Sequence, residues 1–271
     1  MPRAFPCNNP LLMGILNVTP DSFSDGGSHF ALHDALNHAM RMIGDGADMI
    51  DIGGESTRPF SEPVSEDEEL SRVIPVIEKL RSMSDITISV DTYKAAVADE
   101  ALKAGADIVN DISGLMFDEK MAQVIAGHNA YAVIMHMKGT PKNMQENPVY
   151  GDVVTEVMAF LRRQSTYAAK NGIDAKKIII DPGIGFGKRV EDNLRILKML
   201  HAFKELGKPV LIGTSMKSFI GKITEASLEE RVEGTLATLA LALMNGADIL
   251  RVHDVVRAGR VLKMVKAVMD A

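Results

Sequence analysis

The chain has little cysteine and no long hydrophobic run. Its 271 residues include a single cysteine, Cys7, so no disulfide can form within the chain. This composition suits a reducing compartment, and the first ten residues lack the charged-then-apolar pattern of a secretion signal. No stretch of 18 or more apolar residues occurs, so we expect no membrane span. Together these absences predict a cytoplasmic protein.

Basic stretches are missing as well. The formal net charge is −6, and the sequence contains no long basic run and no basic amphipathic helix. We therefore expect no nucleic-acid partner and no membrane-surface partner. Small anionic substrates stay possible, because a site can be locally basic on an acidic protein.

The usual metal and nucleotide motifs are absent too. The seven histidines show no HExxH spacing and no Cys/His cluster exists, which argues against a structural zinc ion. The glycine-rich segments have neither P-loop spacing nor a Rossmann pattern after the first predicted strand. A magnesium ion held by one or two protein oxygens and a substrate diphosphate needs no dedicated motif, so that possibility stays open.

A short internal repeat organises the chain. The tripeptide Gly-Ala-Asp occurs at residues 46–48, 105–107 and 246–248, each time between a helix-like segment and a β-rich run. A glycine after the last helical turn followed by a strand is the ordinary end of a helix-to-strand loop. Ser65 with Glu68, and Ser227 with Glu230, have capping-box spacing; the second pair precedes an apolar helix expected to end near Asn245.

Eight short runs have the composition of buried strands. Most are continuous apolar segments, as in a parallel sheet covered on both faces. They are Leu11–Asn17, Met49–Gly53, Thr87–Asp91, Ile108–Ile112, Ala132–His136, Lys177–Asp181, Val210–Thr214 and Ile249–His253. Eight strands that alternate with helices in a chain of this length predict one α/β domain over residues 1–271, a (β/α)8 TIM barrel. An open doubly wound sheet is the alternative.

Nearly every predicted strand ends on polar residues. In a barrel the carboxyl ends of the strands meet at one face, which holds the active site. A single strand-end aspartate is often only a turn former or a helix cap, but polar ends on all eight strands together predict a functional site. These residues are Asn17, Asp51, Asp91, Asn110 with Asp111, His136, Asp181, Thr214 with Ser215, and Arg251 with His253.

The same segments carry motifs that resemble those of the dihydropteroate synthases, a family of pterin-binding enzymes. Residues 13–27, MGILNVTPDSFSDGG, are similar to the first signature of that family, and residues 51–59, DIGGESTRP, to the second. Residues 89–92, 110–112, 136–141, 181–188 and 251–254 complete the resemblance, which runs from about Leu11 to the C-terminal region. It implies an enzyme of folate biosynthesis that joins 6-hydroxymethyl-7,8-dihydropterin diphosphate to p-aminobenzoate, giving 7,8-dihydropteroate and pyrophosphate.

The resemblance also implies roles for single residues. The pterin would be bound by Asp91, Asn110, Ile112, Met137, Asp181 and Lys217. A carboxylate such as Asp181 can accept two adjacent N–H donors of the pterin edge. The p-aminobenzoate would be bound by Phe23, Thr57, Arg58, Pro59, Phe186 and Ser218. The diphosphate would be bound by Asn17, Arg251 and His253, with Mg2+ as the cofactor and Asn17 as its protein ligand.

The implied reaction is a substitution at the pterin methylene carbon, in which the arylamine nitrogen attacks and pyrophosphate leaves. Mg2+, Arg251 and His253 would stabilise the charge on the leaving group. Lys217 and Asp25 complete the expected catalytic residues, with Asp25 near the developing positive charge. Loops that carry Phe23, Asp25 and Arg58 would close over the site and exclude water.

Two further implications concern partners. The resemblance predicts a homodimer, and we expect its interface on the last helices, where Leu236, Leu239 and Leu243 are unusually apolar. It also implies that sulfonamides could compete for the p-aminobenzoate pocket.

Three positions depart from the family pattern. Met216 stands where an arginine is usual, Phe60 replaces a glycine after Arg58-Pro59, and Tyr93 replaces a smaller residue. Two alternative functions use a similar barrel. A methyltetrahydrofolate corrinoid methyltransferase would need no diphosphate site, and a non-catalytic pterin-binding protein is supported only by Met216.

Overall fold

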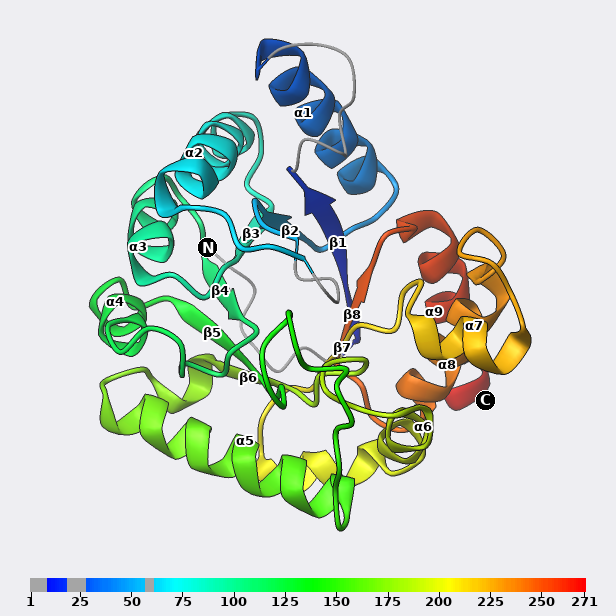
Figure 1. Cartoon of the computed structure of the whole chain (residues 1–271). Helices are drawn as coiled ribbons and strands as arrows, with labels where there is room; N and C mark the ends of the chain where they lie inside the picture. Colours follow the sequence, from blue (N-terminus) through cyan, green and yellow to red (C-terminus); the bar gives the residue numbers. More distant parts are fainter. Residues whose placement is uncertain (1–8, 19–27, 57–60) are drawn as a thin grey trace.

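The computed structural model describes residues 9–18, 28–56 and 61–271, with the backbone only for residues 28–31. In these ranges, parallel strands form a ring with helices around it (Figure 1). The strand order is β6-β5-β4-β3-β2-β1-β8-β7. A bridge between Ile180 and Val210 brings the two ends of this sheet together. The predicted (β/α)8 barrel is therefore confirmed, and the open doubly wound sheet is wrong.

The first three strands match their predicted bounds, and the other five differ by one or two residues at an end. The strands are β1 (Leu11–Asn17), β2 (Met49–Gly53), β3 (Thr87–Asp91), β4 (Ile108–Asp111), β5 (Tyr131–Met135), β6 (Ile178–Asp181), β7 (Leu211–Ile212) and β8 (Ile249–Val252). The largest difference is at β7, where the chain leaves the sheet after Ile212 instead of Thr214.

The described helices lie outside the ring. They are α1 (Ser28–Gly44), α2 (Glu66–Met83), α3 (Ala95–Lys103), α4 (Met121–Gly127), α5 (Val153–Lys170), α6 (Val190–Lys198), α7 (Ser218–Thr224), α8 (Val232–Met244) and α9 (Val255–Met269). Two short 3-10 helices, η2 (Ala175–Lys177) and η3 (Leu200–Leu206), precede β6 and β7. No helix in the described part of the chain is both long and apolar enough to cross a membrane.

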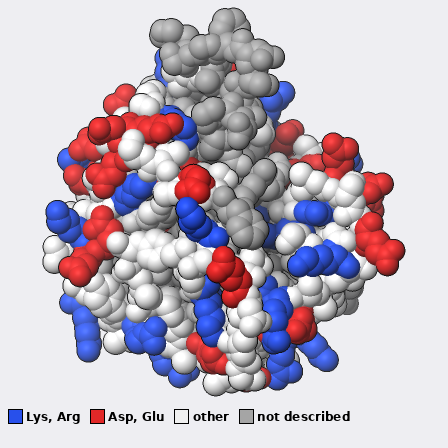
Figure 2. All heavy atoms as spheres, viewed as in Figure 1, with Lys and Arg blue, Asp and Glu red and all other residues white. Residues whose placement is uncertain are grey.

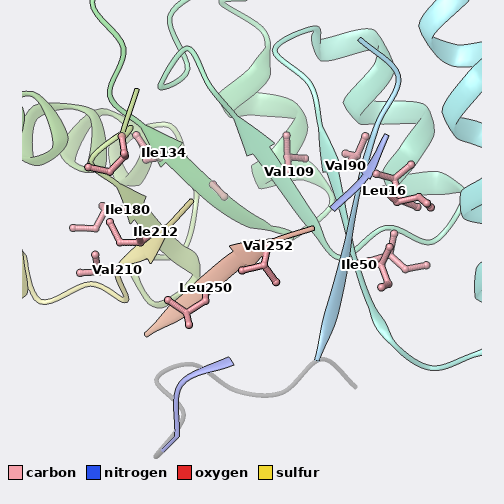
Figure 3. Packing of buried hydrophobic residues seen from close by; sticks show 14 of the residues in the cluster. Leu16, Ile50, Val90, Val109, Ile134, Ile180, Val210, Ile212, Leu250 and Val252 are labelled. Carbon is pink, nitrogen blue, oxygen red and sulfur yellow. The ribbon is translucent and has the colours of Figure 1, made fainter. Parts of the chain in front are cut away.

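Buried hydrophobic side chains form two clusters on opposite sides of the sheet. The outer cluster lies between the strands and the helices, and Figure 3 labels ten of its members. The inner cluster fills the barrel with Leu11, Met13, Met49, Ile108, Tyr131, Val133, Ile179, Leu211 and Ile249. Successive residues of a strand alternate between the two sides, as Ile108 and Val109 do on β4. This alternation also decides which polar residues at the strand ends point into the barrel.

The three Gly-Ala-Asp repeats have one common structure. Each glycine has a positive φ, between 97° and 114°, where a side chain would be strained. Each aspartate then binds the backbone of the neighbouring strand segment at two points. Asp107, for example, donates its N–H to the Ile88 carbonyl at 2.8 Å and accepts the Ile88 N–H on its carboxylate at 2.9 Å. Asp48 binds Leu12, and Asp248 binds Val210, in the same way.

The two predicted helix starts have different outcomes. The Ser65 hydroxyl accepts the Glu68 N–H at 3.2 Å and caps α2, as expected. The Glu230 carboxylate accepts the Ser227 N–H at 3.0 Å, but this contact belongs to a turn before α8, whose cap residue is Arg231. The helix starts later than expected because the Arg231 N–H closes that turn on the Leu228 carbonyl. The end of α8 at Met244, with Asn245 as its C-cap, agrees with the sequence.

These repeats generate a stability prediction. Asp107→Ala leaves the N–H of fully buried Ile88 without its side-chain acceptor and removes the ion pair with Arg81 (2.6 Å). We expect the free energy of unfolding to fall by about 1–3 kcal/mol, the usual cost of a buried donor left unsatisfied. Denaturant titration followed by circular dichroism measures this, with exposed Asp270→Ala as the matched control. Equal midpoints for the two variants would contradict the role given to the repeat.

Candidate active site

Three of the four neighbouring strands β1 to β4 bring a polar residue near their carboxyl end to one level of the barrel, and β2 has a glycine there. In the parallel register, Asn17 of β1 pairs with Gly53 of β2, Gly53 with Asp91 of β3, and Asp91 with Asn110 of β4. A Cβ at Gly53 would lie 3.5 Å from the Asp91 Cβ and 3.9 Å from the Asn17 Oδ1. The glycine thus leaves open space between the Asn17 and Asp91 side chains.

One arginine joins the acidic residues at the carboxyl ends of the strands, which form the mouth of the barrel. The Arg251 Nε donates to the Asp51 Oδ2, and its Nη2 donates to the Asp91 Oδ2, both at 2.6 Å. The Asn110 amide donates to the same Asp51 oxygen at 3.0 Å. Asp51 is fully buried, and these two donors compensate its carboxylate for the loss of water. Sequence reasoning counted Asp51 among the polar strand ends but gave it no role in the site.

The carboxylates of this mouth keep unused acceptor atoms. Among the described residues, the buried Asp51 Oδ1 and Asp91 Oδ1 have no hydrogen-bond partner. Burial raises the pKa of Asp91 to about 7; Arg251 opposes the shift, whereas Asp51 and other nearby carboxylates add to it. Buried acceptors without partners are costly unless a ligand satisfies them, so these two atoms mark where donors of a bound molecule are expected.

Asp181, at the end of β6, and Lys217, after β7, are close enough to interact electrostatically. The Asp181 Oδ1 accepts the Gly183 N–H at 2.7 Å, and burial raises the pKa of this carboxyl while that bond and Lys217 oppose the shift. The Lys217 Nζ lies 4.0 Å from the centre of the Phe186 ring. Surrounding protein atoms displace water from this ammonium and lower the Lys217 pKa to about 8, and Arg251 adds to the decrease.

His253 and Ser215 lie side by side at the ends of β8 and β7. The His253 Nδ1 is 2.9 Å from the Ser215 Oγ, and His253 is exposed. Both residues also line a cavity of about 510 Å³ between α1, α8 and the start of α9. Ser218 is exposed next to Lys217, Met137 is partly buried after β5, and Ile112 is buried after β4. The structure thus brings His253 and Ser215 together, although sequence reasoning gave Ser215 no role.

Three of the polar strand ends point out of the barrel and belong to the scaffold. The Asp111 carboxylate accepts the Ser113 and Leu115 N–H groups at 2.7 and 3.1 Å and forms a turn. The Thr214 hydroxyl contacts Thr238 of α8 at 3.0 Å. His136 packs edge-on against Phe160 of α5, with ring centres 4.9 Å apart. The functional site predicted from the polar strand ends does not include these three, because each is one residue out of phase with the inward-facing positions.

Buried His136 has a further partner, Lys188, from the glycine-rich loop after β6. The Lys188 Nζ lies 2.9 Å from the His136 Nδ1 and donates to the Phe186 carbonyl at 3.0 Å. Burial lowers the pKa of this lysine to about 7, with Lys217 adding to the decrease and Asp181 opposing it. The amine therefore fixes the loop that carries Phe186 to the end of β5.

Tyr93, which departs from the family pattern, lies in a buried network behind β2. Its hydroxyl donates to the Glu55 carboxylate at 2.5 Å, and Lys94 binds Glu55 and Glu69 at 2.6 and 2.5 Å. Tyr93 thus contacts the start of the loop after β2. Phe23, Asp25, Thr57, Arg58, Pro59 and Phe60 lie outside the described residues.

Charge on the visible face is mixed. Figure 2 shows Lys and Arg interspersed with Asp and Glu over the described part of this face. The positive charge identified near the barrel mouth comes instead from Lys217, Lys188 and Arg251, inside or at the rim of the ring. In the described residues no group of three or more histidine, cysteine or acidic side chains could hold a metal ion.

Comparison with known proteins agrees with this geometry. The profile of the pterin binding enzyme family matches residues 13–253. A dihydropteroate synthase of Bacillus subtilis is 54% identical over 260 residues, covering 96% of this chain and 89% of that protein. The chain belongs to the pterin-binding enzymes, in the dihydropteroate synthase branch of that family.

Solved structures give the same result. The Yersinia pestis dihydropteroate synthase, solved as a sulfonamide drug complex, has a TM-score of 0.93 and 43% identity, covering 99% of both chains. The Xanthomonas albilineans enzyme in complex with 7,8-dihydropteroate has a TM-score of 0.88 and 42% identity, covering 97% of this chain and 95% of the other.

The pKa values of Asp91 and Lys217 predict that kcat/KM has a bell-shaped dependence on pH. Asp91 accepts hydrogen bonds best when ionised, so kcat/KM for the pterin substrate should fall as pH drops through about 7. Lys217 donates best when protonated, so kcat/KM should also fall as pH rises through about 8. Steady-state assays at several pH values test this. Asp91→Asn should lack the acid limb that an Asp270→Asn control retains, and equal acid limbs in both variants would exclude Asp91 as its source.

Proposed function

We propose that the described strand ends bind the pterin and its diphosphate during dihydropteroate synthesis. The observation that carries this proposal is the unpartnered, buried Asp91 Oδ1, which lies in the barrel mouth together with Asn110, Asp181 and Lys217. A pterin edge offers adjacent N–H donors to such carboxylates, and its opposite edge offers a carbonyl and a ring nitrogen to an ammonium. Ile112 and Met137 would form apolar walls against the flat ring.

The diphosphate would lie toward Asn17, Arg251 and His253. Arg251 uses two N–H donors on Asp51 and Asp91, and a guanidinium has five, so the same group can hold the acids and contact an anion. Asn17 presents an amide oxygen beside the gap at Gly53, and an amide oxygen is a ligand that Mg2+ accepts. A bound Mg2+ would supply charge neutralisation on the leaving diphosphate.

The p-aminobenzoate would enter over Phe186 and Ser218. The Phe186 ring gives an apolar surface, and the exposed Ser218 hydroxyl can donate to the aryl carboxylate. The arylamine lone pair forms a bond to the pterin methylene carbon while the bond to the diphosphate oxygen breaks. One amine proton is then released. Sulfonamides, which share the shape of the arylamine, would compete at this pocket.

Order of binding tests this arrangement. If diphosphate and Mg2+ help to assemble the aryl site, p-aminobenzoate should bind at least about tenfold more tightly with Mg2+ and pyrophosphate than alone, about 1.4 kcal/mol. Isothermal titration calorimetry with and without these additions measures the difference, and an Asn17→Ala variant should lose most of it. The same affinity under all conditions would contradict the proposed diphosphate and metal site.

The protein would act as a homodimer in the cytoplasm. The expected interface residues Leu239 and Leu243 are buried inside the subunit, because they pack against the barrel. The exposed apolar side chains of the last helices include Leu241 and Met244 on α8 with Met264 and Val268 on α9. These form the candidate interface in place of the buried Leu239 and Leu243, and the partly buried Leu236 stays a prediction.

Sedimentation velocity tests the dimer. Leu241→Glu should shift the protein from dimer to monomer because it places a charge in a desolvated contact, whereas Leu194→Glu, at a slightly less exposed leucine on α6, should not. A monomeric wild type, or a Leu241→Glu dimer, would refute this interface.

A further inference from the structure

Met216 has an unusual backbone conformation directly before Lys217. Its φ is 59°, in the left-handed region that residues other than glycine rarely adopt. The short loop from Gly213 to Lys217 connects β7 to α7, and Met216 turns the chain between them. Such a conformation is strained for a residue with a side chain, and it persists where surrounding contacts hold it.

Helix α8 and its N-cap residue, Arg231, supply these contacts. The Thr235 Oγ1 accepts the Met216 N–H at 3.1 Å, and the Arg231 Nη1 donates to the Met216 carbonyl at 3.2 Å. One turn further, Thr238 contacts the Thr214 hydroxyl at 3.0 Å. Residues spaced four and then three apart lie on the same side of a helix, so this side of α8 contacts the loop both at Thr214 and at Met216. Thr235 is buried, so its bond to Met216 is shielded from water.

Arg231 is itself held tightly. A Cβ at Gly221 of α7 would lie 2.6 Å from the Arg231 Nε and 3.0 Å from its Nη2. The guanidinium therefore packs directly on the backbone of α7, the helix that begins just after Lys217. The arginine connects α7, α8 and the Met216 carbonyl at one point.

The side chain of residue 216 points away from the pterin site. The Met216 Sδ is 3.9 Å from the Thr235 Oγ1, on the α8 side of the loop. The departure from the family pattern at this position thus lies beside α8. What residue 216 contributes to the site is its backbone turn, which directs Lys217 along the loop after β6. A Cβ at Gly185 would lie 3.1 Å from the Lys217 Cδ, so the lysine runs close against that loop.

We propose that Thr235 and Arg231 are positioning residues for Lys217. They hold Met216 in its left-handed conformation, and this conformation aims the Lys217 ammonium at the pterin. The inference rests on the proposed pterin role of Lys217. It adds that pterin binding depends on the position of the first turns of α8, which do not contact the pterin themselves.

A rescue experiment tests this proposal. Thr235→Val keeps the side-chain shape but removes the acceptor for the Met216 N–H. We expect Kd for pterin diphosphate, measured by calorimetry without p-aminobenzoate, to rise about tenfold, about 1.4 kcal/mol. Adding Met216→Gly should return Kd to within about threefold of wild type, because glycine adopts a positive φ without needing contacts that stabilise it. Thr235→Ser, which keeps the hydroxyl, should bind like wild type.

Controls separate positioning from general stability. Thr166→Val on the exposed face of α5 is the matched substitution and should leave Kd unchanged. Arg231→Met removes the donor to the Met216 carbonyl and provides the same test if Thr235→Val fails to fold. Wild-type affinity in both variants, or a defect that Met216→Gly does not reduce, would overturn the proposal. A wild type that fails to bind pterin diphosphate would refute the proposed function, and this inference with it.

Discussion

The active site depends on one arginine placed among buried acids. Arg251 comes from β8, and its two ion pairs reach β2 and β3 across the barrel mouth. Without a cation between them, Asp51 and Asp91 would be two neighbouring carboxylates that repel each other in a poorly hydrated space. The arginine instead keeps a fixed set of acceptor atoms facing the opening. A polar ligand therefore meets groups that are already oriented, so less reorganisation opposes binding.

Much of this site can be predicted from sequence because two rules act together, one for finding strands and one for where their ends lie. Apolar runs locate the strands, and in a barrel all their carboxyl ends share one face. The same signal failed for Asp111, His136 and Thr214, since the end of a strand does not by itself say which side a residue faces. The alternation of inner and outer residues decides this. Asp91 and Asp181 are in phase with the barrel interior, whereas Asp111 is in phase with the helices.

Other features depend on contacts between distant residues and leave no local signal. The turn at Met216 needs Thr235, nineteen positions later, and nothing in the neighbouring sequence indicates a left-handed methionine. The apolar helix α8 likewise does not reveal its buried face from composition, because leucine and alanine occur nearly all around it. Leu239 and Leu243 therefore looked like interface residues, although they complete the core of a single subunit.

The Gly-Ala-Asp repeats bind neighbouring strands at the amino ends, whereas the substrates are expected at the carboxyl ends. In these three strand segments the amino end carries bonds that close the ring, whereas the carboxyl end faces the ligand. A substitution in a substrate loop leaves the bonds of Asp48, Asp107 and Asp248 intact. A barrel built in this way can change what it recognises, or escape an inhibitor, with little loss of folding. Selection can then act on its loops almost independently of the strands that form the barrel.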